Sequence, residues 1–177
     1  MSAVSYRPRY TVDDYLHWEG DWELWDGVPV AMSPSPDYLH QPAGRKIFKQ
    51  LLRQLDAEGC EGRCEALYEI DWHVDRETVV RPDLIVICER PEGQWIEKRP
   101  EFVVEILSPS TRQKDLVAKR ELYAANAVPF YLIVHPDERS ALLLEWKEGS
   151  YTERTADAPV QLHPGCNLSL EIASLFV

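Results

Sequence analysis

Two acidic residues stand where a folded chain would normally place only apolar side chains. Asp83 follows Val80-Arg81-Pro82 at the head of one apolar run, and Glu105 lies inside the next run, Phe102–Leu107. An isolated ionised carboxylate in a dry interior is very unfavourable, and two of them about 4 Å apart repel by roughly 4 kcal/mol at an effective dielectric of 20. A divalent cation removes both penalties, since Mg²⁺ prefers carboxylate oxygens. The pair therefore predicts a metal site for phosphodiester hydrolysis. The alternative is that both acids cap strand ends or pair with Lys or Arg.

The stretch that follows the second acid offers further charged and polar groups. Asp115, Lys119 and Tyr123 are spaced i, i+4 and i+8, so in an α-helix they lie along one stripe. On spacing alone, Lys119 could be a solvated helix residue, the usual environment of lysine. Asp115 could serve only to neutralise Lys119, and Tyr123 is expected to pack in the core.

Local signals define the elements of the first third of the chain. Thr11 and Asp14 resemble a capping box with Asp in place of Glu. Asp26-Gly27 between two apolar runs is typical of a tight hairpin. From about His40 the apolar residues recur with helical period until Gly59. The predicted elements are a helix over 12–18, strands over 22–25 and 28–32, and a helix from about residue 40 to Gly59.

The rest of the chain alternates between apolar runs and one more helix. The helix over 112–126 follows Ser110 and Thr111, either of which could be its N-cap. The near-continuous apolar run over 130–134 is typical of a central strand covered on both faces. The other predicted strands cover 66–74 and 79–88 as an antiparallel pair, 102–107, and a meander over 141–146, 151–154 and 168–172. We expect both long helices to pack on one mixed sheet.

Composition limits the class of protein. A chain of 177 residues is expected to form one domain with a substantial core. It holds no apolar stretch of the roughly 20 residues that span a membrane and no signal-peptide core at its start, so we expect a cytoplasmic protein. The four cysteines do not complete a zinc-binding spacing, with Cys60 and Cys64 as C-x₃-C and the other two alone. Reduced, partly buried thiols are therefore expected.

The charge balance bears on a nucleic-acid ligand in two opposite ways. A net charge of -11 opposes binding to phosphates, because that affinity comes largely from Lys and Arg. Eight of the 19 basic residues nevertheless fall in two short windows, which would allow a local basic surface on an acidic body. These residues are Arg45, Lys46, Lys49 and Arg53 in the first window, and Arg112, Lys114, Lys119 and Arg120 in the second.

The order of these motifs resembles a known family. The set comprises Trp22-Glu23-Leu24-Trp25-Asp26-Gly27, Ser33-Pro34-Ser35 with His40, Arg81-Pro82-Asp83, Glu105 to Thr111, and Asp115 to Lys119. From about Tyr10 to Pro136, and more loosely to the end, it is similar to the Uma2 family of putative restriction endonucleases, within the PD-(D/E)xK nuclease superfamily. No single motif decides this resemblance, and it rests on the ordered set.

The resemblance implies a fold and a division of the chain. It implies an α/β, restriction-endonuclease-like fold with a mixed central β-sheet flanked by helices. One such domain would cover residues 1–177, with an N-terminal helix and hairpin at 10–32, a core at 40–136 and C-terminal strands at 141–177.

The resemblance also implies site residues. Asp83 and Glu105 would hold the metal, Mg²⁺ or alternatively Mn²⁺. The residues implied to be catalytic in the hydrolysis are these two acids and Lys119, Glu23 and His40. The lysine that the superfamily places two residues after the second acid is Leu107 here, which points to Lys119 on the next helix. Glu23 matches an extra acid that related nucleases place at the first hairpin. His40 would be a phosphate contact, a base or only a helix cap.

Three functions remain open on the sequence. The first is a Mg²⁺-dependent DNA endonuclease acting as a homodimer, since cutting both strands needs two sites. The second is a non-catalytic protein that keeps the fold and binds nucleic acid or a partner, which the net charge and the missing lysine favour. The third is a metal-dependent hydrolase of another phosphoester such as RNA. The roles of Asp115 and Tyr123, the recognition sequence and the natural substrate are left open.

Overall fold

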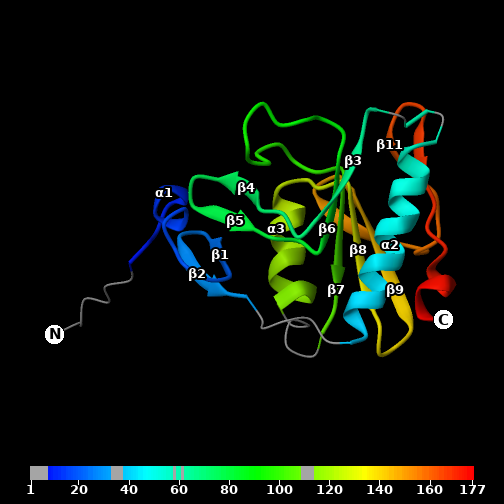
Figure 1. The fold of residues 1–177 in the computed structure, drawn as a ribbon, viewed down its shortest axis with the longest axis horizontal. Helices are drawn as coiled ribbons and strands as arrows, with labels where there is room; N and C mark the ends of the chain where they lie inside the picture. The colour runs from blue at the N-terminus through cyan, green and yellow to red at the C-terminus, as the bar shows by residue number, and fades with distance from the viewer. Residues whose placement is uncertain (1–7, 33–37, 58, 61, 109–113) are drawn as a thin grey trace.

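A six-stranded mixed sheet forms the centre of the molecule in the computed structural model (Figure 1). The structure describes residues 8–32, 38–57, 59, 60, 62–108 and 114–177, with the side chains at 114 and 115 excluded. The order β10-β9-β8-β7-β6-β3 includes one parallel pair, β7 with β8, and the other four pairs are antiparallel. The strands are β3 (Glu65–Tyr68), β6 (Leu84–Ile87), β7 (Phe102–Ile106), β8 (Phe130–His135), β9 (Ser140–Lys147) and β10 (Ser150–Arg154).

Helices cover both faces of this sheet, as Figure 1 shows with the sheet seen nearly edge-on. On one face α2 (His40–Leu55) packs its apolar stripe, which includes Ile47, against Val104 and Ile106 of β7. On the other face α3 (Arg120–Ala125) buries Tyr123 against a second cluster that includes Val103. Successive residues of β7 thus enter different cores, which follows from the period of two along a strand. The predicted mixed sheet flanked by helices is confirmed.

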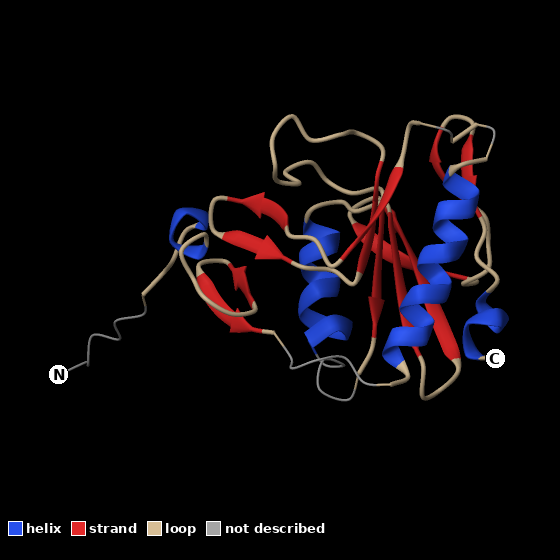
Figure 2. Ribbon diagram, viewed as in Figure 1, coloured by secondary structure: helices blue, strands red, loops and turns tan. Residues whose placement is uncertain are grey.

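A smaller four-stranded sheet stands beside the α3 face (Figure 2). Its order is β2-β1-β5-β4. Asp26 and Gly27 link β1 to β2 with φ values of 47° and 76°, the left-handed pair that a two-residue hairpin needs. The predicted box at Thr11 is present, because Thr11 donates its N–H to the Asp14 carboxylate. The elements are α1 (Val12–Tyr15), β1 (Trp22–Trp25), β2 (Val28–Ala31), β4 (Trp72–Asp75) and β5 (Thr78–Val80).

The two long strands expected over 66–74 and 79–88 are each divided between the two sheets. The first run breaks at Glu69, whose φ of 46° is incompatible with a strand, and the second breaks around Pro82. The inner halves pair as β4 with β5 in the small sheet, and the outer halves pair as β3 with β6 in the large one. The predicted antiparallel pairing of the two runs is therefore confirmed, but the prediction that each run is one strand is wrong. The break leaves Arg81-Pro82-Asp83 at the junction of the two sheets.

The helix expected over 112–126 differs at its start. Its first described segment is a π-helix, η1 (Lys114–Lys119), which continues directly into α3. The candidate N-caps Ser110 and Thr111 lie outside the described residues. Single π turns are rare and recur at functional sites, and here the turn ends at Lys119.

The C-terminal segment departs from the expected meander after β10. β11 (Val160–His163) and β12 (Cys166–Leu168) form a separate hairpin, and a 3-10 helix, η2 (Ile172–Phe176), follows. The strand expected over 168–172 is wrong, because side chains of α2 replace a strand partner there. The amide oxygens of Gln54 and Gln50 accept the backbone N–H groups of Ser169 and Glu171 at 2.8 Å each.

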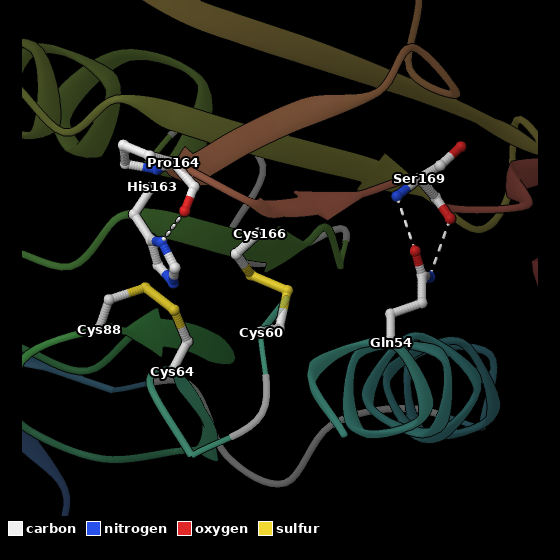
Figure 3. The surroundings of a disulfide bond; sticks show 8 residues. All are labelled: Gln54, Cys60, Cys64, Cys88, His163, Pro164, Cys166 and Ser169. Carbon is white, nitrogen blue, oxygen red and sulfur yellow. Dashed lines mark hydrogen bonds between the residues drawn. A yellow bond between two sulfur atoms is a disulfide. The ribbon is translucent and has the colours of Figure 1, made fainter. Parts of the chain in front are cut away.

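All four cysteines are paired, against the expectation of reduced thiols. The bonds join Cys60 to Cys166 and Cys64 to Cys88 (Figure 3). Sequence spacing could not reveal the pairs, since their partners lie 106 and 24 residues apart. Cys60 and Cys166 meet only when the C-terminal hairpin docks, and Cys64 and Cys88 meet because β3 pairs with β6. In the described part of the chain, no helix is both long and apolar enough to cross a membrane.

Candidate functional site

The two predicted metal-binding acids lie at one end of the large sheet, where β6 begins and β7 ends. β6 and β7 pair with Leu84 opposite Val104, so the same register brings Asp83 opposite Glu105 one residue further on. Asp83 precedes the first residue of β6, and Glu105 is the penultimate residue of β7. The helices α2 and η1–α3 also begin at this end of the sheet (Figure 1). The chain thus concentrates its candidate residues where four elements start or stop.

Glu105 is held by two side chains from the helix on its face of the sheet. Its Oε1 atom lies 2.8 Å from the Lys119 ammonium and accepts the Tyr123 hydroxyl at 2.6 Å. Lys119 and Tyr123 are four residues apart, so both reach the same oxygen from adjacent turns. The carboxylate is 2% exposed and Lys119 is 4% exposed. Lys119 is therefore a buried residue and not a solvated one.

Glu23 joins the same cluster from the small sheet. It sits in β1 with 0% exposure, accepts the backbone N–H of Arg81 at 2.8 Å, and lies 3.3 Å from the Lys119 ammonium. Lys119 also donates to the carbonyl of Arg81 at 3.4 Å. One ammonium thus bridges carboxylates from both sheets and the backbone segment that leads to Asp83.

Asp83 makes its contacts toward the start of α2 and the end of β7. The backbone N–H of Ile106 donates to Oδ2 of Asp83 at 2.6 Å, and His40 Nε2 lies 3.2 Å from Oδ1. His40 is the first residue of α2 and is buried. Asp83 is therefore fixed to the residue that follows Glu105. His40 and Asp83 form one group, and Glu23, Glu105 and Lys119 form another, joined through short backbone segments.

Tyr123 was expected to fill the core, and its hydroxyl has an additional contact with the site. Burial, followed by the negative charge of Glu105, raises the pKa of Tyr123 well above its ordinary value. The phenol therefore keeps its proton and donates it to the carboxylate. The signal in the sequence was the i, i+4 spacing from Lys119, which was noted but could not separate a core tyrosine from a contact of Glu105.

A support network behind the site was not predicted. The Arg81 side chain donates to Asp71 at 2.7 Å and to Asp21 at 3.0 Å. These contacts, with Asp71 foremost, raise the pKa of Arg81 above its ordinary value. Tyr15 of α1 donates to the other oxygen of Asp71 at 2.8 Å, and burial and Asp71 raise the pKa of Tyr15. The small sheet and α1 thus hold the segment that carries Asp83.

Two other positions named from the sequence are Leu107 and Asp115. Leu107, at the position where the superfamily places its lysine, is buried in the apolar cluster beneath α3. The side chain of Asp115 lies outside the described part of the structure.

The donor set at this end of the sheet fits a hard divalent cation. Asp83 and Glu105 supply carboxylate oxygens from adjacent strand positions, and Mg²⁺ prefers oxygen ligands over nitrogen or sulfur. Lys119 and Tyr123 both contact the same oxygen of Glu105, Oε1, so the contacts from the helix are on one side of this carboxylate.

Comparison with known proteins places the chain in a family. The model of the family Uma2, described as "Putative restriction endonuclease", matches residues 12–173. The chain belongs to the Uma2 family. A Synechocystis sp. protein named "Uncharacterized protein slr1290" is 32% identical to this Uma2 chain over 136 residues, which cover 72% of this chain and 69% of that protein.

A solved structure shows the same fold. The crystal structure of a "putative nuclease belonging to DUF820" from Anabaena variabilis superposes with a TM-score of 0.74, covering 94% of this Uma2 chain and 99% of that one. Their sequence identity is 17%, so this likeness bears on the fold alone. The restriction-endonuclease-like fold expected from the sequence is confirmed.

Proposed function

We propose that this Uma2 protein is a metal-dependent endonuclease that hydrolyses phosphodiester bonds in DNA. The observation that carries the proposal is the Lys119 ammonium, held 2.8 Å from Glu105 although Lys119 comes from a different element than the superfamily lysine. A buried lysine beside a strand acid, with a second acid at the paired position of the neighbouring strand, supports this chemistry.

Asp83 and Glu105 would hold the metal, Mg²⁺ or Mn²⁺. When bound, the metal supplies a water of lowered pKa and neutralises charge that develops on the phosphate. Family membership supports a divalent metal in general, and the oxygen donors support Mg²⁺ or Mn²⁺ in particular.

The chain's own residues would divide the remaining tasks. Lys119 would stabilise negative charge on the phosphate or hold the attacking water, since a preorganised cation in a buried site is strongly stabilising. Glu23 and the Arg81 carbonyl fix the ammonium in place, and Tyr123 fixes Glu105. His40 would orient the Asp83 carboxylate through Nε2. In this proposal His40 is therefore a positioning residue for Asp83.

The proposed substrate is duplex DNA, bound beside α2. Arg45 and Lys49 are exposed on this helix, whose first residue contacts Asp83. We further propose a homodimer, because two sites related by a two-fold axis cut both strands most simply. One restriction-endonuclease-like domain over residues 1–177 and a cytoplasmic location remain part of this proposal.

A second candidate function is a non-catalytic protein that binds nucleic acid or another partner through the same fold. Glu23, Glu105 and Lys119 are at most 4% exposed, and Lys119 forms ion pairs with both acids. The cluster could therefore be a buried ion-pair network that only stabilises the fold. The net charge of -11 favours a partner other than DNA.

The test is cleavage of supercoiled and linear DNA, and of RNA, with Mg²⁺ or Mn²⁺. Asp83→Asn and Glu105→Gln should each abolish cleavage and weaken Mn²⁺ binding measured by calorimetry. Arg90→Gln, at an exposed residue beyond the other end of β6, is the matched control and should retain both properties. Mn²⁺ binding that Asp83→Asn leaves unchanged would exclude the proposed metal site. Failure to bind Mn²⁺ or cut any substrate would favour the second function.

A further inference from the structure

A second group of potential metal ligands lies at the opposite end of β6 from the candidate nuclease site. Cys60 and Cys64 lie between α2 and β3, Cys88 follows β6, and His163 and Cys166 flank the turn of the β11–β12 hairpin. Figure 3 shows the two disulfides side by side, with the His163 ring directed toward them. Five residues with sulfur or imidazole donors thus converge from three separate segments.

The spacing of the donor atoms is close to that of a tetrahedral metal site. One ligand atom each from Cys64, His163 and Cys166 lies within 4.8 Å of the other two. A tetrahedral site with Zn–S bonds of about 2.3 Å places its sulfur atoms about 3.8 Å apart. These three donors therefore need to approach one another by only about 1 Å to meet one ion. The fourth donor, Cys60 or Cys88, must separate from its disulfide partner by about 2 Å once the S–S bond is reduced.

His163 is already arranged as a ligand. Its Nδ1 lies 2.9 Å from the Pro164 carbonyl oxygen, which can only accept, so Nδ1 carries the proton and donates it. Nε2 then presents a lone pair, and this atom is buried without a hydrogen-bond partner among the described residues. Metal-binding histidines characteristically donate their other ring N–H to a carbonyl or carboxylate in this way.

Contacts other than the S–S bonds keep these segments together. Gly59 and Gly165, each next to a cysteine, approach so closely that a Cβ on Gly59 would lie 2.2 Å from the Gly165 carbonyl oxygen. Gln54 makes two hydrogen bonds to the backbone of Ser169, at 2.8 and 2.9 Å (Figure 3). The Gln54 hydrogen bonds do not depend on the S–S bonds, and neither does the pairing of β3 with β6, which Cys64 precedes and Cys88 follows. Reduction of the disulfides would therefore leave these segments close together.

We propose that the reduced chain binds one Zn²⁺ through Cys64 Sγ, Cys166 Sγ and His163 Nε2, with the thiolate of Cys60 or Cys88 as the fourth ligand. Each disulfide first takes two electrons and two protons from a dithiol reductant, which becomes a disulfide itself. Zn²⁺ then displaces the protons of three thiols and accepts the lone pair of the neutral imidazole. Three sulfurs and one nitrogen form a closed structural zinc set, and soft donors select zinc over Mg²⁺. The ion would fasten the β11–β12 hairpin to the large sheet.

Cobalt substitution tests the site in the full chain. Protein reduced with a phosphine should take up one Co²⁺ with thiolate-to-cobalt charge-transfer absorption and tetrahedral d–d bands, and Zn²⁺ should displace it. Oxidised protein should show neither signal. Asp83→Asn should keep the charge-transfer band, which separates this site from the carboxylate site. A reduced protein without that band would overturn the proposal.

Variants then identify the ligands. Cys64→Ser and His163→Gln should each weaken Zn²⁺ binding by more than the roughly 10- to 100-fold that loss of a supporting residue causes. His163→Gln leaves both disulfides able to form, so it serves if Cys64→Ser fails to fold. Loss of tight binding in Cys60→Ser or in Cys88→Ser names the fourth ligand. Undiminished binding in His163→Gln, or in both of these serine variants, would overturn the proposed ligand set.

Discussion

Lys119 provides the positive charge that pairs with both Glu23 and Glu105 in the candidate site. Removing one partner of a buried, paired charge costs about 3–5 kcal/mol, because the remaining charges stay buried without compensation. Lys119→Met keeps the length of the side chain and leaves Glu23 and Glu105 without their shared ammonium. We expect the free energy of unfolding of the metal-free protein to fall by about that amount, as measured by urea denaturation.

Lys49→Met is the matched control for this change. Lys49 is exposed on α2, where such substitutions usually alter stability by no more than about 0.5 kcal/mol. The deficit of Lys119→Met should also shrink as pH falls, since a protonated carboxyl no longer repels its neighbour. Equal stability of the two variants would contradict the buried ion-pair network.

Tyr123 tests the second contact of Glu105. Tyr123→Phe removes only the hydroxyl that donates to Oε1 at 2.6 Å. A hydrogen bond to a charged group contributes about 1.5–3 kcal/mol, against about 1 kcal/mol for a neutral acceptor. We therefore expect a larger loss of unfolding free energy than for Tyr151→Phe, whose hydroxyl donates to the neutral Val128 carbonyl at 3.0 Å. Equal losses would show that the charge of Glu105 adds nothing to the Tyr123 bond.

At the scale of elements, β4 contacts the loop that follows β6 through an aromatic stack. The His73 ring of β4 is buried and lies 4.8 Å from the Trp95 ring, nearly parallel to it. Burial lowers the pKa of His73 below 6.5, although the nearby acids Asp71 and Glu97 oppose this shift. The folded state therefore binds fewer protons than the unfolded state in the pH range between the lowered folded pKa and about 6.5.

The consequence is a stability that falls as pH decreases. The contribution of neutral His73 is fully present above its unfolded pKa of 6.5 and is lost as pH falls toward its lower folded pKa. The slope from this one group cannot exceed about 1.4 kcal/mol per pH unit. His73→Phe keeps an aromatic stack without a titrating group, so its unfolding free energy should depend less on pH between 6.5 and 5. An identical slope in the two proteins would exclude His73 as the source.

The elements also show which features local sequence can define. The hairpin at Asp26-Gly27 was predictable because two consecutive left-handed residues suit a single turn type. The division of the 66–74 run was not, because both halves are apolar and only their partners in different sheets distinguish them. The π turn before Lys119 has no comparable signal in the apolar pattern.

In the candidate site too, local sequence reveals some residues, and others become visible only from contacts between distant elements. Asp83 and Glu105 stand out locally as acids in apolar runs, and their catalytic roles stay predictions. The contact of Lys119 with Glu23 depends on docking the small sheet against α3, which no sequence spacing encodes. The Arg81–Asp71–Tyr15 network was missed for the same reason, since its members come from different parts of the small-sheet region.

For the whole molecule, the main question is how a chain of net charge -11 could bind DNA. A local basic surface can attract phosphates on an acidic body. Of the first basic window, Arg45 and Lys49 are exposed, whereas Lys46 bonds to the C-terminal backbone at Leu175. In the second window, Lys119 is buried, whereas Arg112 and the side chain of Lys114 lie outside the described part of the structure. Among the side chains that the structure describes, the proposed interface therefore depends chiefly on Arg45 and Lys49 of α2.

The double variant Arg45→Glu/Lys49→Glu should weaken DNA binding measured by fluorescence anisotropy with Ca²⁺ in place of Mg²⁺. Each phosphate contact contributes about 0.9 to the slope of log affinity against log salt, so the slope should become shallower by about 2. The matched control is Arg90→Glu/Lys98→Glu, in the loop between β6 and β7 at the opposite end of the sheet. Two reversals change the charge by -4, so both variants go from -11 to -15. Equal weakening in both would mean that only net charge matters, and no binding by the unchanged protein at low salt would favour the partner-binding function.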